Sequence, residues 1–351
     1  MRITYVTEDT ELWGGIGVIF QHLEMLAAAG HDVFLTTPTS GPDWYPLKVP
    51  IYTIKSIEPS LLPDADIIVI ASWRIAKAIV ASKKGLPVYL CQGYEASLKE
   101  LDAFKSEIDE VYSLGLPILT ISRHLSDLIR ERFNAETYYV GQMVNRKIFY
   151  PRRNPLKRFF THSGRPSRLL VVGPFEGSYK NIPTILRGIS LANKSFKKPL
   201  NVIRVSQFPL SPKEEQIMKP AEYQCRVPYN RMGDIYRSSD MLISLSTEAE
   251  GFGLPVLEAM ACGVPTILSR IPSHLGFDEP LDYALFVDSE PPALSEAIQK
   301  MYEDAGLRLR LSNRGLSVAE KFTPETLLTR LVNAFGDIIS RKQQGTKEVK
   351  V

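Results

Sequence analysis

The stretch from Ser246 to Arg270 reads STEAEGFGLPVLEAMACGVPTILSR. The residues before it, 241–245, form a short apolar run that predicts a buried strand. Pro255 suits the first turn of a helix, and Gly263 is typical of the left-handed residue that ends one. Residues 266–269 predict the next strand. The stretch therefore indicates strand, glycine loop, helix and strand, which is one parallel crossover unit.

The loop between the first strand and the helix carries groups that suit a polar ligand. Gly251 and Gly253 let the backbone pass close to a ligand and turn its amides outward. These amides lie at a helix N-terminus, where partial positive charge favours phosphate or other oxygens. Glu250 and Glu258 bracket the loop with seven residues between them, and each carboxylate can accept two sugar hydroxyls. A plain turn, with Glu258 in the first helical turn only complementing the helix dipole, is the alternative interpretation.

The wording EGFGLPVLEAMACGVP closely resembles the Glu-x7-Glu signature of the large retaining glycosyltransferase family usually numbered four, which has the two-domain GT-B fold. The resemblance implies that Glu250 lies by the donor sugar and that Glu258 binds the ribose of the nucleotide. It also implies which backbone amides hold the sugar hydroxyls and the diphosphate: those of Gly251, Phe252, Gly253 and Leu254.

The composition is that of an ordinary globular protein. The 351 residues are 44% hydrophobic and 23% charged, and this length allows two domains with separate cores. A net charge of +3 is too small to favour nucleic acid as a main partner. No apolar run approaches the ~18 residues of a membrane span, and the chain starts like a strand rather than a signal peptide, so we expect a cytoplasmic protein. Cys91, Cys225 and Cys262 each lie in or beside an apolar run, which predicts buried free thiols.

The first half of the chain alternates strands and helices, which favours a parallel sheet covered by helices on both faces. Strands are expected at 3–6, 32–36, 51–54, 67–71, 88–91 and 118–121, and helices at 18–29, 73–83 and 125–133. The glycines at 14–17 are interpreted as a turn before the first helix. They make a poor dinucleotide fingerprint, because Phe20 stands where a third glycine belongs. The resembled family has a Gly-Gly turn here that faces the diphosphate and acceptor, and Gly14 and Gly15 match it; a plain turn is the alternative.

The segment Tyr89-Leu-Cys-Gln-Gly-Tyr-Glu95 ends a strand, so its last residues lie at the carboxyl edge of the sheet, where open α/β sheets bind ligands. The resembled family often has His in place of Gln92, near the reacting sugar, and this wording resembles a branch with Gln there. Gln cannot act as a base, but it can hydrogen-bond a sugar hydroxyl. We therefore expect Gln92, Tyr94 and Glu95 on the acceptor side. The proton acceptor would be Glu95, the donor's own phosphate or another residue, and Glu95 as a neighbour of a helix N-terminus is the alternative.

Residues 151–168 are expected to link two domains. The segment is basic, has no acidic residue, and carries Phe159 and Phe160 in its middle. Such a segment can lie on an anionic membrane surface, or it can be a solvated linker whose phenylalanines pack on a domain. Just upstream, residues 144–151 partly resemble the family's Asn-Gly-Val-Asp…Phe-x-Pro segment, with Asn145 where Asp is usual.

The second domain is expected to start with a strand at 169–173. Where the family has Gly-Arg followed by Lys, two cations that hold the donor diphosphate, this chain has Pro174 and then Lys180. A lysine facing two phosphates stabilises the departing nucleotide, while an exposed loop lysine is the alternative. Arg204, Arg231 or an arginine of the linker are candidates to replace the missing cation.

The remaining elements continue the alternation. Strands are expected at 201–205, 223–227 and 283–287, and helices up to 193 and at 213–218, 232–238, 293–302, 307–321 and 324–340. Residues 271–277 are expected to form a loop, and its lone His274 is interpreted as a surface group. The last helix is expected to return to the first domain, as in GT-B enzymes.

These features predict an α/β protein with two Rossmann-like domains facing across a cleft, the GT-B fold. The expected order is an N-terminal acceptor-binding domain, a basic linker, a nucleotide-sugar-binding domain, a helix crossing back and a disordered tail, at 1–150, 151–168, 169–322, 323–342 and 343–351.

The resemblance implies a retaining, metal-independent glycosyltransferase of the hexosyltransferase type, with Glu250 and Lys180 catalytic. Its partners would be a nucleoside diphosphate sugar and an acceptor hydroxyl on a glycan, a lipid-linked sugar or a small molecule, in polysaccharide biosynthesis, with no cofactor. Contact with the inner face of a membrane stays open. A sugar-nucleotide epimerase and a non-catalytic nucleotide-sugar-binding protein are the alternatives, and Pro174 and Gln92 keep the second one open.

Overall fold

The computed structural model describes residues 1–152 and 168–348. Most of the predicted basic linker, with Phe159 and Phe160, lies outside these residues. The chain divides into two compact units, which we describe separately. Unit 1 comprises Met1–Ser97, Leu101–Met143 and the C-terminal segment from Thr323, and unit 2 comprises Leu98–Glu100 and Val144–Phe322. The boundary thus precedes Val144, earlier in the chain than expected.

Unit 1 contains a seven-stranded sheet in the order β3-β2-β1-β4-β5-β6-β7, in which every strand pair is parallel. The central strands are apolar and buried, as the run Ile67–Ile70 illustrates. The strand order reverses between β1 and β4, which makes this point the place where open α/β sheets bind ligands. The strands are β1 (Arg2–Val6), β2 (Asp32–Thr37), β3 (Ile51–Thr53), β4 (Ile67–Ile70), β5 (Leu86–Cys91), β6 (Ile118–Thr120) and β7 (Thr137–Tyr139).

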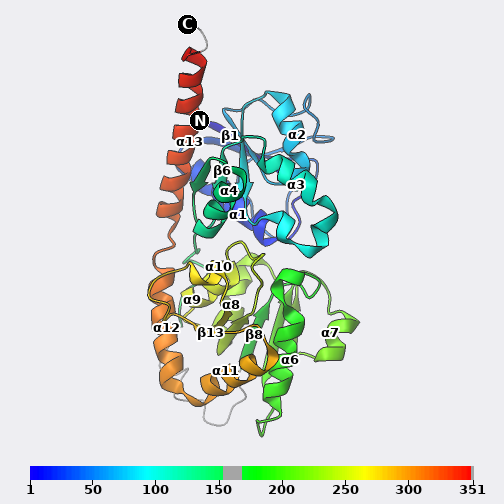
Figure 1. The fold of residues 1–351 in the computed structure, drawn as a ribbon, viewed down its shortest axis with the longest axis vertical. Coiled ribbons are helices and arrows are strands. Elements are labelled where there is room, and N and C mark those ends of the chain that lie inside the picture. Colours follow the sequence, from blue (N-terminus) through cyan, green and yellow to red (C-terminus); the bar gives the residue numbers. More distant parts are fainter. Residues whose placement is uncertain (153–167, 349–351) are drawn as a thin grey trace. The chain divides into compact units, whose positions relative to one another are not determined.

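The helices of unit 1 are α1 (Gly14–Ala28), α2 (Trp73–Ser82), α3 (Lys105–Tyr112), α4 (Arg123–Phe133) and α13 (Pro324–Glu348), with a 3-10 turn η1 (Glu95–Ser97); a second 3-10 turn, η2 (Lys99–Phe104), spans the boundary with unit 2. Helix α13 (red in Figure 1) buries Leu327, Leu331 and Phe335, which recur at the spacing of one helical face. The hydroxyl of Tyr138 donates to Asp337 at 2.8 Å and joins this helix to strand β7. The helix runs through 343–348, where the sequence indicated disorder.

Unit 2 contains a six-stranded sheet in the order β10-β9-β8-β11-β12-β13, again with every pair parallel. Here the order reverses between β8 and β11, so the loops after these two strands emerge side by side. The strands are β8 (Arg168–Val172), β9 (Asn201–Ser206), β10 (Glu222–Cys225), β11 (Met241–Ser244), β12 (Thr266–Ser269) and β13 (Leu285–Val287).

The helices of unit 2 are α6 (Ile182–Asn193), α7 (Pro212–Ile217), α8 (Tyr229–Ser238), α9 (Leu254–Ala261), α10 (Pro272–Leu275), α11 (Pro291–Glu303) and α12 (Ala305–Ala319), with a 3-10 turn η3 (Ser178–Lys180). Helix α6 packs against α11 (Figure 1), and a Cβ at Gly188 would lie only 2.7 Å from Leu294 Cδ2. The apolar faces of these helices and of the central strands make one buried core.

The predicted class, two Rossmann-like α/β units, is confirmed by the two parallel sheets. Within the described parts of the chain, no helix is both long enough and apolar enough to span a membrane. All three cysteines are free. Cys91 and Cys262 are buried as predicted, but Cys225 is exposed because it ends the edge strand β10.

Candidate active site

Lys180 and Glu250 meet at the point where the strand order of unit 2 reverses. Lys180 ends the turn η3 in the loop after β8, and Glu250 lies in the loop after β11. The distance from Lys180 Nζ to Glu250 Oε2 is 2.5 Å, and the two side chains are only 11% and 9% exposed. Ser246 Oγ donates to the same carboxylate oxygen at 2.9 Å. Lys180 is thus a buried partner of Glu250 rather than an exposed loop lysine.

The two charges of this pair hold each other in the ionised state. Burial alone would raise the pKa of Glu250, but the Lys180 ammonium and the Ser246 hydroxyl outweigh it, and the pKa is lowered. Burial likewise opposes the charge on Lys180, yet Glu250 raises the lysine's pKa above its ordinary value. An ammonium has three N–H donors, so Lys180 can hold Glu250 and still donate to a phosphate.

Gly173 has no side chain, and this leaves room for the side chain of Lys180 to cross the loop. Its φ is +127°, a conformation that disfavours any other residue. A Cβ at this position would lie 2.9 Å from Lys180 Cγ. The glycine directly after β8 therefore lets the lysine stem lie against the backbone, which directs the ammonium toward Glu250.

Arg204, a candidate for the missing phosphate-binding cation, binds protein groups inside unit 2 instead. It is fully buried, and its Nε lies 2.5 Å from Glu214 Oε1. Its two terminal nitrogens donate to the carbonyl oxygens of Val171 and Gly173, at 2.8 and 2.9 Å. Arg204 thus holds the end of β8 in place, and it does not replace the arginine absent at Pro174. Arg231 is 72% exposed, on helix α8.

The loop from Gly251 to Leu254 carries four backbone amides at the start of helix α9. Gly253 has φ +88° and precedes α9, which begins at Leu254 with Pro255 in its first turn, as predicted. Among the residues described, the amides of Gly251, Phe252, Gly253 and Leu254 have no hydrogen-bond acceptor. The Phe252 ring packs at 5.2 Å from Phe277 and 5.7 Å from Phe322, so the core anchors the loop. The geometry provides an anchored row of donors at a helix N-terminus.

Glu258 lies just past the first turn of α9, one residue further along the helix than the sequence indicated, because the helix starts at Leu254. The Tyr236 hydroxyl donates to Glu258 Oε2 at 2.7 Å. Burial raises the pKa of Glu258 to about 7, although Tyr236 and Lys180 act in the opposite direction. This carboxyl group therefore changes charge near neutral pH.

The prediction that His274 is a surface group is wrong. His274 lies on the short helix α10, where a loop was expected, and its side chain is fully buried. Its Nδ1 lies 3.2 Å from both the carbonyl oxygen and the hydroxyl oxygen of Ser269. Burial lowers the pKa of His274 to about 4, so the ring is neutral at pH 7. The overlooked signal was Pro272, which suits a helix start directly after a strand.

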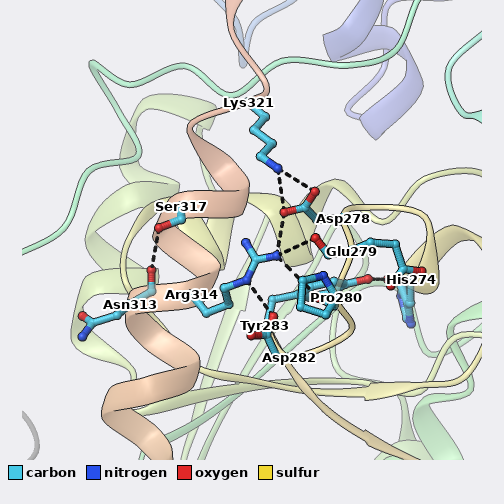
Figure 2. Close-up of polar contacts among 10 residues, drawn as sticks. All are labelled: His274, Asp278, Glu279, Pro280, Asp282, Tyr283, Asn313, Arg314, Ser317 and Lys321. Carbon is cyan, nitrogen blue, oxygen red and sulfur yellow. Dashed lines mark hydrogen bonds and ion pairs between the residues drawn. The ribbon is translucent and has the colours of Figure 1, made fainter.

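Figure 2 shows how the segment after α10 is tied to helix α12. Arg314 on α12 reaches Asp278 Oδ2 at 2.7 Å and Asp282 Oδ1 at 2.6 Å, and Lys321 also binds Asp278. The hydroxyl of Tyr283 donates to the carbonyl oxygen of His274 at 2.6 Å. This network holds the backbone that carries His274.

In unit 1, the structure brings together two of the predicted site residues. Gly14 and Gly15 do not form a turn before the first helix but lie in the first turn of α1. Gln92 Nε2 donates to the carbonyl oxygen of Gly15 at 3.1 Å, and a Cβ at Gly15 would lie 3.0 Å from that nitrogen. The absence of a side chain at Gly15 thus makes room for Gln92.

Tyr94 and Glu95 are held within unit 1 by other side chains. The buried Tyr94 donates its hydroxyl to Asp109. The two oxygens of Glu95 accept hydrogen bonds from the hydroxyls of Tyr89 and Tyr112, both at 2.6 Å. Burial raises the pKa of Glu95 despite these two bonds. Each carboxyl oxygen of Glu95 therefore already accepts a hydrogen bond from a tyrosine.

The described residues include no group of three His, Cys, Asp or Glu side chains that could hold a metal ion. In unit 2, the ammonium of Lys180 meets the carboxylate of Glu250, next in sequence to the amides from Gly251 to Leu254. Glu258 lies on helix α9, which begins where this loop ends.

Residues 212–318, which include the glycine loop and His274, match the family model described as "Glycosyl transferases group 1". Among curated relatives, the O-antigen chain mannosyltransferase B of Escherichia coli is 38% identical over 90 residues, which are 24% of this chain and 22% of that protein. The N-acetyl-alpha-D-glucosaminyl L-malate synthase of Bacillus anthracis is 24% identical over 262 residues, which are 72% of this chain and 66% of that protein. The chain thus spans less than two thirds of the length of either relative.

Among solved structures, HepE from Anabaena in complex with UDP and glucose has a TM-score of 0.77 and 11% identity, covering 96% of this chain and 99% of that one. At this level of identity the likeness concerns the fold. The two Rossmann-like units of this chain therefore have the GT-B fold that the signature around Glu250 implied.

Proposed function

We propose that this chain is a retaining glycosyltransferase, which moves a sugar from a nucleoside diphosphate sugar to an acceptor hydroxyl. The observation that carries the proposal is the buried Lys180–Glu250 pair beside the four unoccupied amides from Gly251 to Leu254. A diphosphate needs a cation and several N–H donors, and a sugar needs paired acceptors. The loops after β8 and β11 supply both kinds of group at one edge of one sheet.

The donor would bind to unit 2 with its diphosphate against the Lys180 ammonium and the loop amides. Glu250 would lie by the sugar, where its negative charge is kept by Lys180. Glu258 would accept the two ribose hydroxyls, a task that suits a carboxylate with free lone pairs. Tyr236 already donates to one oxygen of Glu258 and orients the group.

In the transfer, the bond between the anomeric carbon and the diphosphate oxygen breaks, and a bond to the acceptor oxygen forms on the same face of the sugar. Positive charge develops on the sugar and negative charge on the diphosphate, and the oriented amides, Lys180 and Glu250 stabilise both. The acceptor proton passes to the departing diphosphate, because both oxygens of Glu95 are engaged by tyrosines. These groups supply the charge that the step needs, so we propose a reaction without a metal or cofactor.

We assign the acceptor to unit 1, where Gly14, Gly15 and Gln92 lie after the central strands. The name of the Escherichia coli relative, an O-antigen chain mannosyltransferase, supports a sugar-containing acceptor and a role in polysaccharide biosynthesis. A cytoplasmic enzyme that contacts the inner membrane face through the basic segment 151–168 would meet such an acceptor.

The proposal is tested by calorimetry with UDP-, GDP-, dTDP- and ADP-linked sugars. We expect one class of donor to bind and to be hydrolysed slowly without acceptor. Glu258→Ala should weaken its binding by roughly 10- to 100-fold, since hydrogen bonds to a charged group contribute ~1.5–3 kcal/mol. Failure of every donor to bind to the folded protein would overturn the proposal.

The same panel separates the alternative functions. The absence of an arginine at Pro174 favours a non-catalytic nucleotide-sugar-binding protein as the second candidate, since it leaves Lys180 as the cation of the loop after β8. Such a protein would bind a donor without hydrolysing or transferring it. An epimerase would convert the donor sugar with no acceptor present.

A further inference from the structure

His274 Nε2 is a buried polar atom that has no hydrogen-bond partner within residues 1–152 and 168–348. The whole side chain is inaccessible to solvent, and no protein group among the described residues reaches this nitrogen. Buried polar atoms in folded proteins are normally paired, because leaving one unpaired is unfavourable. The position of Nε2 beside the glycine loop therefore requires an explanation.

The surroundings of the other ring nitrogen decide the tautomer. Nδ1 faces the carbonyl oxygen and the hydroxyl oxygen of Ser269, each at 3.2 Å. The carbonyl can only accept, and the Ser269 hydroxyl already donates its proton to the carbonyl oxygen of Ser246 at 2.7 Å. Nδ1 must therefore carry the ring proton, which leaves a lone pair on Nε2.

The lone pair lies beside the loop that carries the unoccupied amides. A Cβ built on Gly253 would lie 3.3 Å from His274 Cδ2 and 3.4 Å from Nε2. This acceptor nitrogen thus lies beside Gly253, one of the four loop residues whose amides have no acceptor among the described residues. A phosphate oxygen can satisfy only the donors, whereas a hydroxyl can donate to Nε2 and accept from an amide.

We propose that His274 is a sugar-binding residue, whose Nε2 accepts a hydrogen bond from one hydroxyl of the donor sugar. The requirement for that hydroxyl makes His274 a determinant of which sugar is transferred. A site built to pair with a hydroxyl rejects the analogue that lacks it, because a buried polar group is then left unpaired. This inference rests on the proposed function and names the group of unit 2 that recognises the sugar rather than the nucleotide.

Two substitutions distinguish the role of His274 Nδ1 from the role of Nε2. In His274→Asn, the side-chain amide can take the place of Nδ1 and donate to Ser269, but no group reaches the position of Nε2. In His274→Gln, the longer side chain can return an acceptor oxygen to that position. His22 provides a matched control, since it is also fully buried with an unpartnered Nε2 but lies on α1 of unit 1.

The experiment is calorimetry with the nucleoside diphosphate alone and with the nucleotide sugar that the wild-type protein binds. We expect His274→Asn to keep the affinity for the nucleoside diphosphate within about twofold and to lose tenfold or more for the nucleotide sugar. His274→Gln should recover part of this loss. His22→Asn should leave the ratio of the two affinities unchanged.

Nucleotide sugars that each lack one sugar hydroxyl identify the hydroxyl that donates to His274 Nε2. One deoxy donor should bind the wild-type protein more weakly than the full sugar, and its affinity should no longer depend on the His274→Asn change. If the variants do not fold, equal binding of the full sugar and of every deoxy sugar by the wild-type protein overturns the inference.

The outcomes also distinguish the two proposals. Equal losses for nucleoside diphosphate and nucleotide sugar in His274→Asn would show a purely structural role, and no loss for either would also contradict the inference. Both results leave the glycosyltransferase proposal standing. Absence of nucleotide-sugar binding by the folded wild-type protein overturns both.

Discussion

Lys180 and Glu250 are 70 positions apart in the chain, yet the Lys180 ammonium donates to the Glu250 carboxylate at 2.5 Å in a buried position. Each residue follows one of the two strands, β8 and β11, between which the order of the sheet reverses. Each keeps the other charged against the effect of burial. Removing either partner should therefore affect stability as well as ligand binding.

The first prediction concerns Lys180→Met, which leaves the Glu250 charge buried without its partner. We expect the free energy of unfolding to fall by about 3 kcal/mol at pH 7.5, as when other buried pairs are broken. Without the ammonium, burial places the folded-state pKa of Glu250 above its unfolded value of 4.5, so the loss grows as pH rises from there. Urea unfolding at pH 5 and 7.5 measures both effects.

The double variant Lys180→Met/Glu250→Gln is the control for this prediction. It removes both charges and should regain most of the lost stability at pH 7.5. Equal deficits in the single and double variants, at both pH values, would contradict a stabilising ion pair.

The second prediction concerns Glu258, whose pKa is raised from 4.5 to about 7 by burial. A folded-state pKa above the unfolded one means that the stability contribution is present below pH 4.5 and is lost as pH rises through about 7. Between pH 5 and 8 the wild-type protein should lose roughly 2–3 kcal/mol that Glu258→Gln does not lose. The difference between their unfolding free energies, followed against pH, measures this.

Tyr236→Phe tests the cause of that titration. The Tyr236 hydroxyl donates to Glu258 and lowers its pKa, so its removal should move the midpoint of the difference curve to higher pH. A difference curve that stays flat from pH 5 to 8 would show that Glu258 titrates in its ordinary range.

The third prediction concerns Gly173→Ala. The φ of +127° strains any residue with a Cβ, and the added methyl would lie 2.9 Å from Lys180 Cγ. We expect a loss of ~1–3 kcal/mol in the free energy of unfolding, and weaker nucleotide binding because the lysine is displaced. Gly336→Ala is the matched control, since a Cβ built on Gly336 meets no atom of the described residues within 4 Å. It should raise stability by up to ~1 kcal/mol, because alanine favours the helix. Equal effects of the two changes would contradict the strain at Gly173.

The fourth prediction concerns Arg204→Met, which tests whether this arginine is structural. It would leave the Glu214 carboxylate buried and unpaired, so we expect a loss of ~3–5 kcal/mol. Arg204→Met/Glu214→Met should restore most of it in chemical denaturation. An Arg204→Met protein of wild-type stability that binds nucleotide poorly would instead place Arg204 in the phosphate site.

The strand, glycine loop and helix around Glu250 could be predicted because their signals are local. An apolar run, Pro255 near a helix start and Gly263 after its end act within a few residues, and the structure shows Gly263 at φ +67°. The start of α1 is not predictable in this way, because it depends on contacts with distant residues. Gly15 and Gly17 suggest a turn, but they are small because Gln92 and Trp44 pack against the helix there.

Buried charged and polar groups were the hardest to predict. The sequence makes Arg204 a candidate ligand of phosphate, whereas the structure pairs it with Glu214 and with two carbonyl oxygens. The sequence predicts His274 at the surface, but Ser269 and Tyr283 hold its ring and backbone in the interior. Burial of such groups depends on partners that no local pattern identifies.

The sequence alone determined the alternation of strands and helices, the two-unit α/β class and the chemistry of the loop after β11. Hydrophobic periodicity, glycine and proline act over short stretches of chain, so these features can be predicted from the local sequence. Only the tertiary structure places β8 beside β11 and pairs the Lys180 ammonium with the Glu250 carboxylate. It also places the Nε2 atom of His274 beside Gly253. These are contacts between distant residues, and burial changes the charge and pairing of each group only once the chain has folded.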